Sequence, residues 1–173
     1  MKKREKTRQL ILDNSWQLFI VQGYKDTSTR QIATAAGVAT GTVFSHFPNK
    51  IDILKTAMHQ QIDSVIALAQ KTDQHHTARL KLRHYASYLF AFYLQHREFS
   101  KALLGDLLWH QSYFAAQLDA FKHLLFAEQE YDETKATVMM DCYFMTLIQG
   151  LSDPSSCEDS MLRTLTNKLT LLY

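Results

Sequence analysis

Apolar residues recur at helical spacing along nearly the whole chain. Between residues 7 and 22 they return every three or four positions, and Gly23 follows where a helix would end. The stretch TSTRQIATAAG then places Ser28 three residues before Gln31, so that each side chain can satisfy the backbone amide of the other residue. These signals predict helices over about 7–22 and 28–36.

The next two helices are marked by proline and asparagine. A short helix over about 39–45 ends at FPNK, because the residue before a proline resists the α region. Asn49 then caps a long helix over 51–70, with Asp52 near the positive end of the helix dipole.

Beyond residue 70 turn signals become sparse. The chain has only five Gly and two Pro, which is few for an all-β protein. We therefore predict an all-α fold of about nine helices. The later helices are expected over 77–97, over 99–128 as one or two helices with a break at Gly105 or at WHQS, over 132–150 up to Gly150, and over 157–172.

Charge divides the chain into two parts. Residues 1–55 carry nine Lys or Arg against four acids, whereas residues 56–173 carry ten against thirteen. A basic head on a mildly acidic body is expected if the head meets a polyanion, although solubility alone can produce it. With the helix pattern, this predicts a first domain over residues 1–50 and a second over 51–173.

Cysteines and apolar runs bear on the compartment. Cys142 and Cys157 lie in no CxxC pair, which suggests a reducing environment. The basic N-terminus leads into an amphipathic segment rather than a cleavable apolar one, and no apolar run is long enough to span a bilayer. We therefore expect a cytoplasmic protein that has no membrane partner.

The two short helices have the spacing of a helix-turn-helix motif. They meet at AAG, whose small residues suit the turn. Val43 and Phe47 lie four positions apart and would face inward onto Ile32. The outward face and its flanks could enter a major groove, and they comprise Thr40, Gly41, Thr42, Phe44, Ser45 and His46.

A longer stretch carries a family resemblance. LILDNSWQLF followed by TSTRQIATAAGVATGTVFSHFPNKIDIL resembles the DNA-binding domain of the TetR family of one-component transcriptional regulators over residues 8–54. The later helices are similar to the family in number, length and apolar character. The resemblance implies an Ω-like homodimer whose subunits each have three DNA-binding helices and about six more behind them.

The resemblance also implies roles for single residues on double-stranded DNA with a palindromic operator. It further implies that a repressor is more expected than an activator, because a bound dimer most simply blocks polymerase. The positions are Thr29, Arg30, Phe44, His46 and Lys50 for the DNA backbone, and Thr40, Gly41 and Thr42 for the bases.

Three residues depart from the family pattern. Phe44 stands where Tyr is usual and so lacks a hydroxyl for phosphate, Ala39 replaces a capping Ser, and Ser15 replaces a small Ala. The outward face also lacks Arg, Asn and Gln, which make the strong bidentate base contacts. Specificity is therefore expected to depend on thymine methyls, operator shape and paired half-sites.

The arm MKKREKTR has two readings. It is either a solvated, frayed terminus or a contact to phosphate or the minor groove.

The helix over 132–150 predicts a homodimer interface. Asp141 is the only charge in ATVMMDCYFMTLIQGL, and a helix apolar nearly all round must be covered on more than one side. With 157–172 it would form a four-helix interface across a two-fold axis, where the resemblance also places the dimer contact. The alternative is a buried core helix in a monomer. The stripe expected to contribute from the last helix is Met161, Leu162, Leu165, Leu169 and Leu172.

Aromatic residues of the body could line an apolar cavity for a small hydrophobic or aromatic effector. His110, Gln117 and Asp106 could orient such a ligand or could equally face water. The candidates are Tyr85, Tyr88, Leu89, Phe92, Trp109, Tyr113, Phe114, Phe121, Met140 and Phe144.

Enzyme and metal functions receive little support. The sequence has no GxSxG, P-loop or HExxH motif. His75 with His76, or His59 with Asp63, could begin a metal site, but such pairs are more often solvated, so we predict no metal, no cofactor and no catalysis. The alternative function is an all-α small-molecule-binding or interaction protein that does not read DNA.

Overall fold

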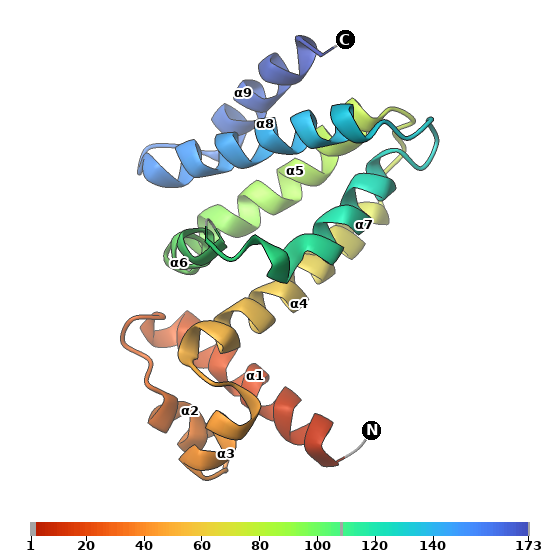
Figure 1. Ribbon diagram of the computed structural model, residues 1–173. Helices are drawn as coiled ribbons and strands as arrows, with labels where there is room; N and C mark the ends of the chain where they lie inside the picture. Colours follow the sequence, from red (N-terminus) through yellow and green to blue (C-terminus); the bar gives the residue numbers. More distant parts are fainter. Residues whose placement is uncertain (1–2, 108, 173) are drawn as a thin grey trace. The chain divides into compact units, whose positions relative to one another are not determined.

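The computed structural model describes residues 3–107 and 109–172, and in this part of the chain every regular element is a helix (Figure 1). The all-α prediction is confirmed. The helices are α1 Lys3–Gln22, α2 Thr29–Ala35, α3 Thr40–His46, α4 Lys50–Gln70, α5 Ala78–Gln95, α6 Arg97–Leu107, the 3-10 helix η1 Gln111–Phe114, α7 Ala115–Leu125, α8 Glu133–Ser152 and α9 Glu158–Thr170.

The chain forms two compact units, Met1–Gln61 and Ile62–Tyr173. The division falls inside α4, eleven residues beyond the expected boundary at residue 50. The first turns of α4 supply Ile53, Leu54 and Met58, all 0% exposed. The first turns of α4 therefore belong to the core of the N-terminal unit rather than to a linker.

The capping box at the start of α2 is present as predicted. The Ser28 hydroxyl accepts from the Gln31 amide at 3.2 Å, and the Gln31 side-chain oxygen accepts from the Ser28 amide at 2.8 Å. Gly37 closes the turn to α3 with φ +63°, a backbone conformation that other residues rarely adopt. Local sequence therefore sets the geometry of the α2–α3 pair.

The core of the N-terminal unit is formed by the predicted inward face of α3 and one stripe of α1. Val43 is 0% and Phe47 is 2% exposed, and Ile32 is 0% exposed. Leu10, one of the apolar residues at helical spacing between residues 7 and 22, lies outside this core and is 45% exposed. The buried stripe of α1 is instead Ile11, Leu12, Ser15, Trp16 and Phe19.

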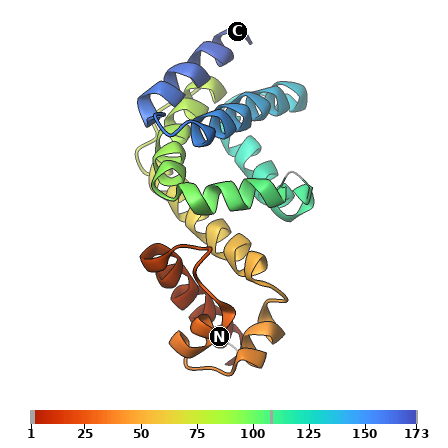
Figure 2. The same cartoon turned by 90° about the vertical axis from the view of Figure 1, so that its left-hand side faces the viewer.

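In the second unit, α9 packs on both α5 and α8 (Figures 1 and 2). This packing shows where the apolar side of the last helix lies in the single chain. Its apolar stripe lies inside its own subunit, since Leu165 and Leu169 are 0% exposed and Met161 is 3% exposed. The stripe is therefore already covered without a second chain.

Two glycines behave differently from their predicted roles as breaks. Of the two predicted break positions, WHQS is confirmed, since the chain breaks near Trp109 and His110, whereas Gly105 lies within α6. Helix α8 continues past Gly150 because the Arg97 guanidinium donates to its last carbonyls, at 2.9 Å to Gly150 and Leu151 and 3.0 Å to Asp153. A neighbouring helix thus caps α8.

Alanine substitutions at Gly150 and Gly105 should change the free energy of unfolding in opposite directions. A Cβ at Gly150 would overlap the Met161 side chain and force it to move, so Gly150→Ala should lower the free energy of unfolding by about 1–3 kcal/mol. A Cβ at Gly105 meets nothing within 4 Å, so Gly105→Ala should raise it by about 0.5–1 kcal/mol. Urea unfolding followed by circular dichroism measures both changes. A stabilising Gly150→Ala would show that Met161 can move aside.

Candidate functional site

The outward face of α3 is open in the N-terminal unit. Gly41, Phe44 and Ser45 are exposed, and the Phe44 side chain is 48% exposed although it is a large apolar ring. Thr40, Thr42 and His46 are half-buried on its flanks. The predicted outward residues therefore share one surface, opposite Val43 and Phe47.

The start of α2 and the start of α3 differ in how they are capped. Ser28 caps α2, on whose first turn Thr29 is half-buried and Arg30 is exposed. Ala39 at the start of α3 makes no side-chain cap, as its lack of an oxygen predicts. Ser15, the other small departure, is 0% exposed and donates to the Ile11 carbonyl at 2.6 Å.

Lys50, predicted to contact phosphate, binds backbone carbonyls of its own unit in the single chain. Its ammonium donates to the carbonyls of Tyr24 at 2.8 Å, Thr27 at 2.9 Å and Lys25 at 3.3 Å. It also lies 4.4 Å from the centre of the Tyr24 ring. Because an ammonium has three donors, these carbonyls take all of them. The geometry makes Lys50 a clamp on the α1–α2 loop.

Arg8, the last residue of the predicted basic arm, holds the N-terminal unit together through contacts with distant residues. Its guanidinium donates to the His46 carbonyl at 3.0 Å and lies 4.1 Å from the centre of the Phe47 ring. A second contact reaches the Thr56 hydroxyl at 3.5 Å. Arg8 therefore fixes the end of α3 to α1 and α4. No local sequence signal identifies it, because its partners lie about forty residues away.

The surroundings of His46 disfavour its charged form. Burial lowers the pKa of His46 below its usual value of 6.5, and the charges of Arg4 and Arg8 lower it further. A neutral imidazole can donate one N–H but adds no positive charge to this surface.

The basic arm is helical where it is described. Helix α1 begins at Lys3, and Lys3, Arg4 and Lys6 are exposed. Met1 and Lys2, which the arm prediction includes, lie outside the described residues.

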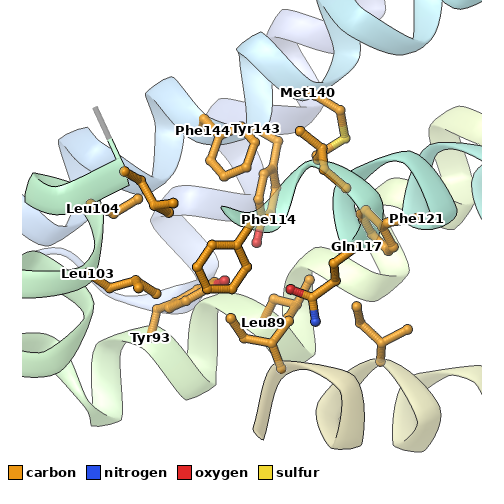
Figure 3. A pocket seen from close by; sticks show the side chains of 14 residues that line it. Leu89, Tyr93, Leu103, Leu104, Phe114, Gln117, Phe121, Met140, Tyr143 and Phe144 are labelled. Atoms are coloured by element: carbon orange, nitrogen blue, oxygen red, sulfur yellow. The ribbon is translucent and has the colours of Figure 1, made fainter. Parts of the chain in front are cut away.

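The second unit contains an apolar cavity between α4, α5, α6, α7 and α8 (Figure 3). It has two adjoining chambers. We call the chamber of about 70 Å³, which Tyr93, Phe121 and Tyr143 line, the inner chamber, and the neighbouring one of about 390 Å³ the outer chamber. The outer chamber is also lined by Asp141 and Ile148. The two chambers share Leu104, Leu107, Phe114, Leu118 and Phe144.

Half of the predicted lining residues face this cavity. They are Leu89, Phe114, Phe121, Met140 and Phe144.

The other five candidates lie elsewhere. Tyr85 is 1% exposed and packs edge-on against Phe121, while burial and the nearby Asp73 raise the pKa of Tyr85 to about 12. Tyr88 shares a hydrogen bond of 2.9 Å with Thr72. The remaining three are Phe92 in contact with His96, Trp109 at 82% exposure and Tyr113 at 39% exposure.

Sequence reasoning missed the contribution of α6 and of two tyrosines. Leucines of α6 were indistinguishable from core residues by pattern alone, and Tyr93 and Tyr143 were not singled out. Of the polar candidates, Gln117 lines the inner chamber and donates to Asp63 at 2.5 Å, while Asp106 and His110 do not line either chamber. The missed lining residues are Tyr93, Leu103, Leu104, Leu107, Leu118 and Tyr143, with Ile62 and Ile66 from α4.

The histidine pairs do not converge on a metal site. His75 contacts the Asp73 carboxylate at 3.0 Å, and His76 contacts Glu128 at 2.5 Å. Among the residues that the structure describes, no three His, Cys, Asp or Glu side chains are grouped closely enough to hold an ion. Within the same residues, no helix combines the length and apolar character needed to cross a bilayer.

Known proteins match the N-terminal unit most strongly. Residues 11–57 match the profile of "Bacterial regulatory proteins, tetR family". The transcriptional regulator SrpR of Pseudomonas putida is 41% identical over 54 residues, which are 31% of this chain and 25% of SrpR. TtgW of the same species is 39% identical over 54 residues, 31% of this chain and 40% of TtgW. The matched part thus spans less than half of either relative.

A longer match extends into the second unit. The regulator SAR2658 of Staphylococcus aureus is 26% identical over 155 residues, covering 87% of this chain and 80% of that protein. Each of these relatives is named as a transcriptional regulator and none as an enzyme, in agreement with the prediction.

Solved structures share the fold over nearly the whole chain. Thermus thermophilus FadR, a TetR-family repressor in complex with lauroyl-CoA, has a TM-score of 0.71 at 21% identity and covers 95% of this chain and 92% of its own. The multidrug binding protein EbrR, complexed with imidazole, has a TM-score of 0.67 at 20% identity, covering 97% and 93%. Residues 11–57 therefore match the TetR family of transcriptional regulators, and the chain as a whole shares the fold of a solved TetR-family repressor.

Proposed function

We propose that the chain is a sequence-specific DNA-binding repressor that a small apolar or aromatic effector releases from its operator in the cytoplasm. The observation that carries the proposal is the surface of α3. Its exposed face presents Gly41, Phe44 and Ser45, while Val43 and Phe47 anchor the opposite face in the core. A short helix held in this way can enter a major groove.

Phosphate contacts are proposed for exposed or half-buried residues around this helix. Thr29 and Arg30 lie on the first turn of α2, and His46 ends α3. Arg30 is the exposed cation of this set, since Lys50 directs its ammonium to loop carbonyls. Non-specific affinity would therefore depend on Arg30 and on Lys3, Arg4 and Lys6 of the arm.

Base recognition is proposed for Thr40, Gly41 and Thr42. Hydroxyls and methyl groups discriminate bases less strongly than bidentate side chains. Paired half-sites and operator shape would supply the remaining specificity.

A homodimer through α8 and α9 fits a palindromic operator. Because the apolar stripe of α9 is buried in its own subunit, the surface available to a second copy is the outer side of the two helices. It includes Asp141, Met145, Gln149, Arg163, Thr164 and Asn167, all of which are exposed in the single chain.

Replacing Phe44 by tyrosine should strengthen operator binding about two- to tenfold, because the added hydroxyl can donate to a phosphate. The ring is 48% exposed, so the hydroxyl needs no space in the core. Fluorescence anisotropy with a labelled operator measures the change. Unchanged or weaker binding would show that the ring packs against sugar, a thymine methyl or its own helix.

Two observations support the proposal that the cavity binds an effector: its apolar lining, and the ligands bound by proteins of the same fold. The chambers are lined almost entirely by apolar side chains, and FadR and EbrR of the same fold were crystallised with lauroyl-CoA and imidazole. A ligand here would weaken DNA binding only if it favours a subunit arrangement in which the recognition helices no longer fit successive major grooves.

Selection of DNA from a random pool by the full chain tests the proposal. We expect a palindrome, bound with an affinity that falls steeply as salt is added. A chain that binds no duplex even at low salt would overturn the regulator proposal and favour a small-molecule-binding protein that does not read DNA.

A further inference from the structure

Two tyrosine hydroxyls enter the inner chamber from different helices. Tyr93 belongs to α5 and Tyr143 to α8, and Figure 3 shows their hydroxyl oxygens turned toward the same space beside Phe114. Tyr93 is 7% and Tyr143 is 3% exposed. The chamber is therefore polar at one point, although leucine and phenylalanine line most of it.

The buried Tyr143 hydroxyl meets no hydrogen-bond partner at full geometry among the residues that the structure describes, and Tyr93 is the side chain near enough to act on it. Leaving a buried hydroxyl unsatisfied costs about 1–3 kcal/mol, so an unsatisfied group in a native protein calls for an explanation. Tyr93 is its neighbour, but one hydrogen bond between two hydroxyls would use only one of their two protons. The pair thus retains at least one O–H donor for another molecule.

Charge restricts what that molecule can be. Burial raises the pKa of both tyrosines well above the usual value of 10, and the adjacent Tyr93 raises that of Tyr143 further, so both hydroxyls stay protonated. No Lys, Arg, His, Asp or Glu is among the described residues that line the inner chamber. An ion placed there would lose its hydration without gaining a counter-charge.

Size places the ligand across both chambers. The inner chamber of about 70 Å³ is smaller than the cavity of about 150 Å³ that holds benzene in another protein. The outer chamber, of about 390 Å³, has room for a ring against Phe114 and Phe144. Such a ring could extend a single polar atom toward Tyr93 and Tyr143.

We propose that this cavity binds an uncharged aromatic compound whose oxygen, such as a ketone carbonyl, accepts a hydrogen bond from the Tyr93–Tyr143 pair. The inference rests on the proposed function only in treating the bound compound as the effector. Gln117 and Asp141 then lie beside the ring rather than at the recognised oxygen.

The test compares two probes of the same shape, acetophenone and α-methylstyrene. Acetophenone has a carbonyl oxygen where α-methylstyrene has a methylene group. Their affinities for the full chain are measured without DNA by isothermal titration calorimetry. We expect acetophenone to bind about tenfold more tightly, the effect of one hydrogen bond to an otherwise unsatisfied hydroxyl.

Tyr143→Phe and Tyr93→Phe test the source of this preference. Tyr143→Phe should reduce the preference for acetophenone to about twofold or less while leaving the affinity for α-methylstyrene unchanged. Tyr93→Phe should also weaken the preference for acetophenone. Tyr88→Phe is the matched control, because Tyr88 is on the same helix as Tyr93 but its hydroxyl contacts Thr72 outside the cavity. Thermal unfolding of each variant verifies that it is folded.

Equal affinities for the two probes, no binding of either, or a preference that survives in both variants would overturn the inference. Operator binding is measured separately on the same protein. Loss of the acetophenone preference with intact operator binding would overturn this inference alone. A preserved preference in a chain that binds no DNA would support the inference and overturn the proposed function.

Discussion

Replacing Phe47 by alanine should abolish operator binding by unfolding the N-terminal unit. Phe47 is 2% exposed, and truncation of a buried phenylalanine costs about 3–5 kcal/mol. The Arg8 guanidinium, 4.1 Å from the ring centre, would lose its contact as well. A unit of this size has a stability of only about 3–9 kcal/mol. Urea unfolding and operator titration of the full chain measure the two effects.

Phe44→Ala is the matched control three residues earlier on the same helix. Because the Phe44 ring is 48% exposed, its removal should change the free energy of unfolding by no more than about 0.5 kcal/mol. Operator binding should still weaken, since the ring lies on the proposed DNA surface. Normal stability and operator binding in Phe47→Ala would contradict the role of Phe47 as anchor.

Replacing Lys50 by methionine should weaken operator binding about tenfold or more without changing its salt dependence. The substitution removes three hydrogen bonds from an ammonium to the loop carbonyls of Tyr24, Lys25 and Thr27. One hydrogen bond to a charged group contributes about 1.5–3 kcal/mol, so the loss of all three should lower the free energy of unfolding by at least that amount. The slope of log affinity against log salt should stay the same, because no phosphate contact is lost.

Arg30→Met should show the reverse of Lys50→Met, with unchanged stability and a smaller salt dependence. Arg30 is exposed at the start of α2, so its loss should leave the free energy of unfolding within about 0.5 kcal/mol of the parent value. If it contacts phosphate, the magnitude of the salt slope should fall by about 0.9. The same reduction in Lys50→Met, with unchanged stability, would show that Lys50 leaves the loop and binds phosphate instead.

The helix-turn-helix unit could be predicted closely because its signals are local. The Ser28–Gln31 capping box, the turn at Gly37 and the four-residue spacing of Val43 and Phe47 each depend on neighbours in sequence, and the structure contains all three. The outward position of Phe44 followed from the same spacing. Short-range patterns therefore identified this surface.

Roles that depend on distant partners could not be predicted. Lys50, Arg8 and Arg97 each bind backbone carbonyls more than twenty residues away, so no local pattern distinguishes them from solvated cations. The cavity shows the same limit. Aromatic composition suggested it, but whether a ring faces the cavity, as Phe114 does, or water, as Trp109 does, is decided by helix packing.

The buried stripe of α9 has a consequence for how such a repressor would respond to its own abundance. Leu165 and Leu169 stabilise the single subunit, which leaves polar side chains such as Thr164 and Asn167, with the exposed Met145, for a second copy. Interfaces with few buried apolar anchors associate weakly. Where two free chains pair only on the operator, its occupancy rises with the square of their concentration. A small change in synthesis or degradation would accordingly produce a steep change in repression.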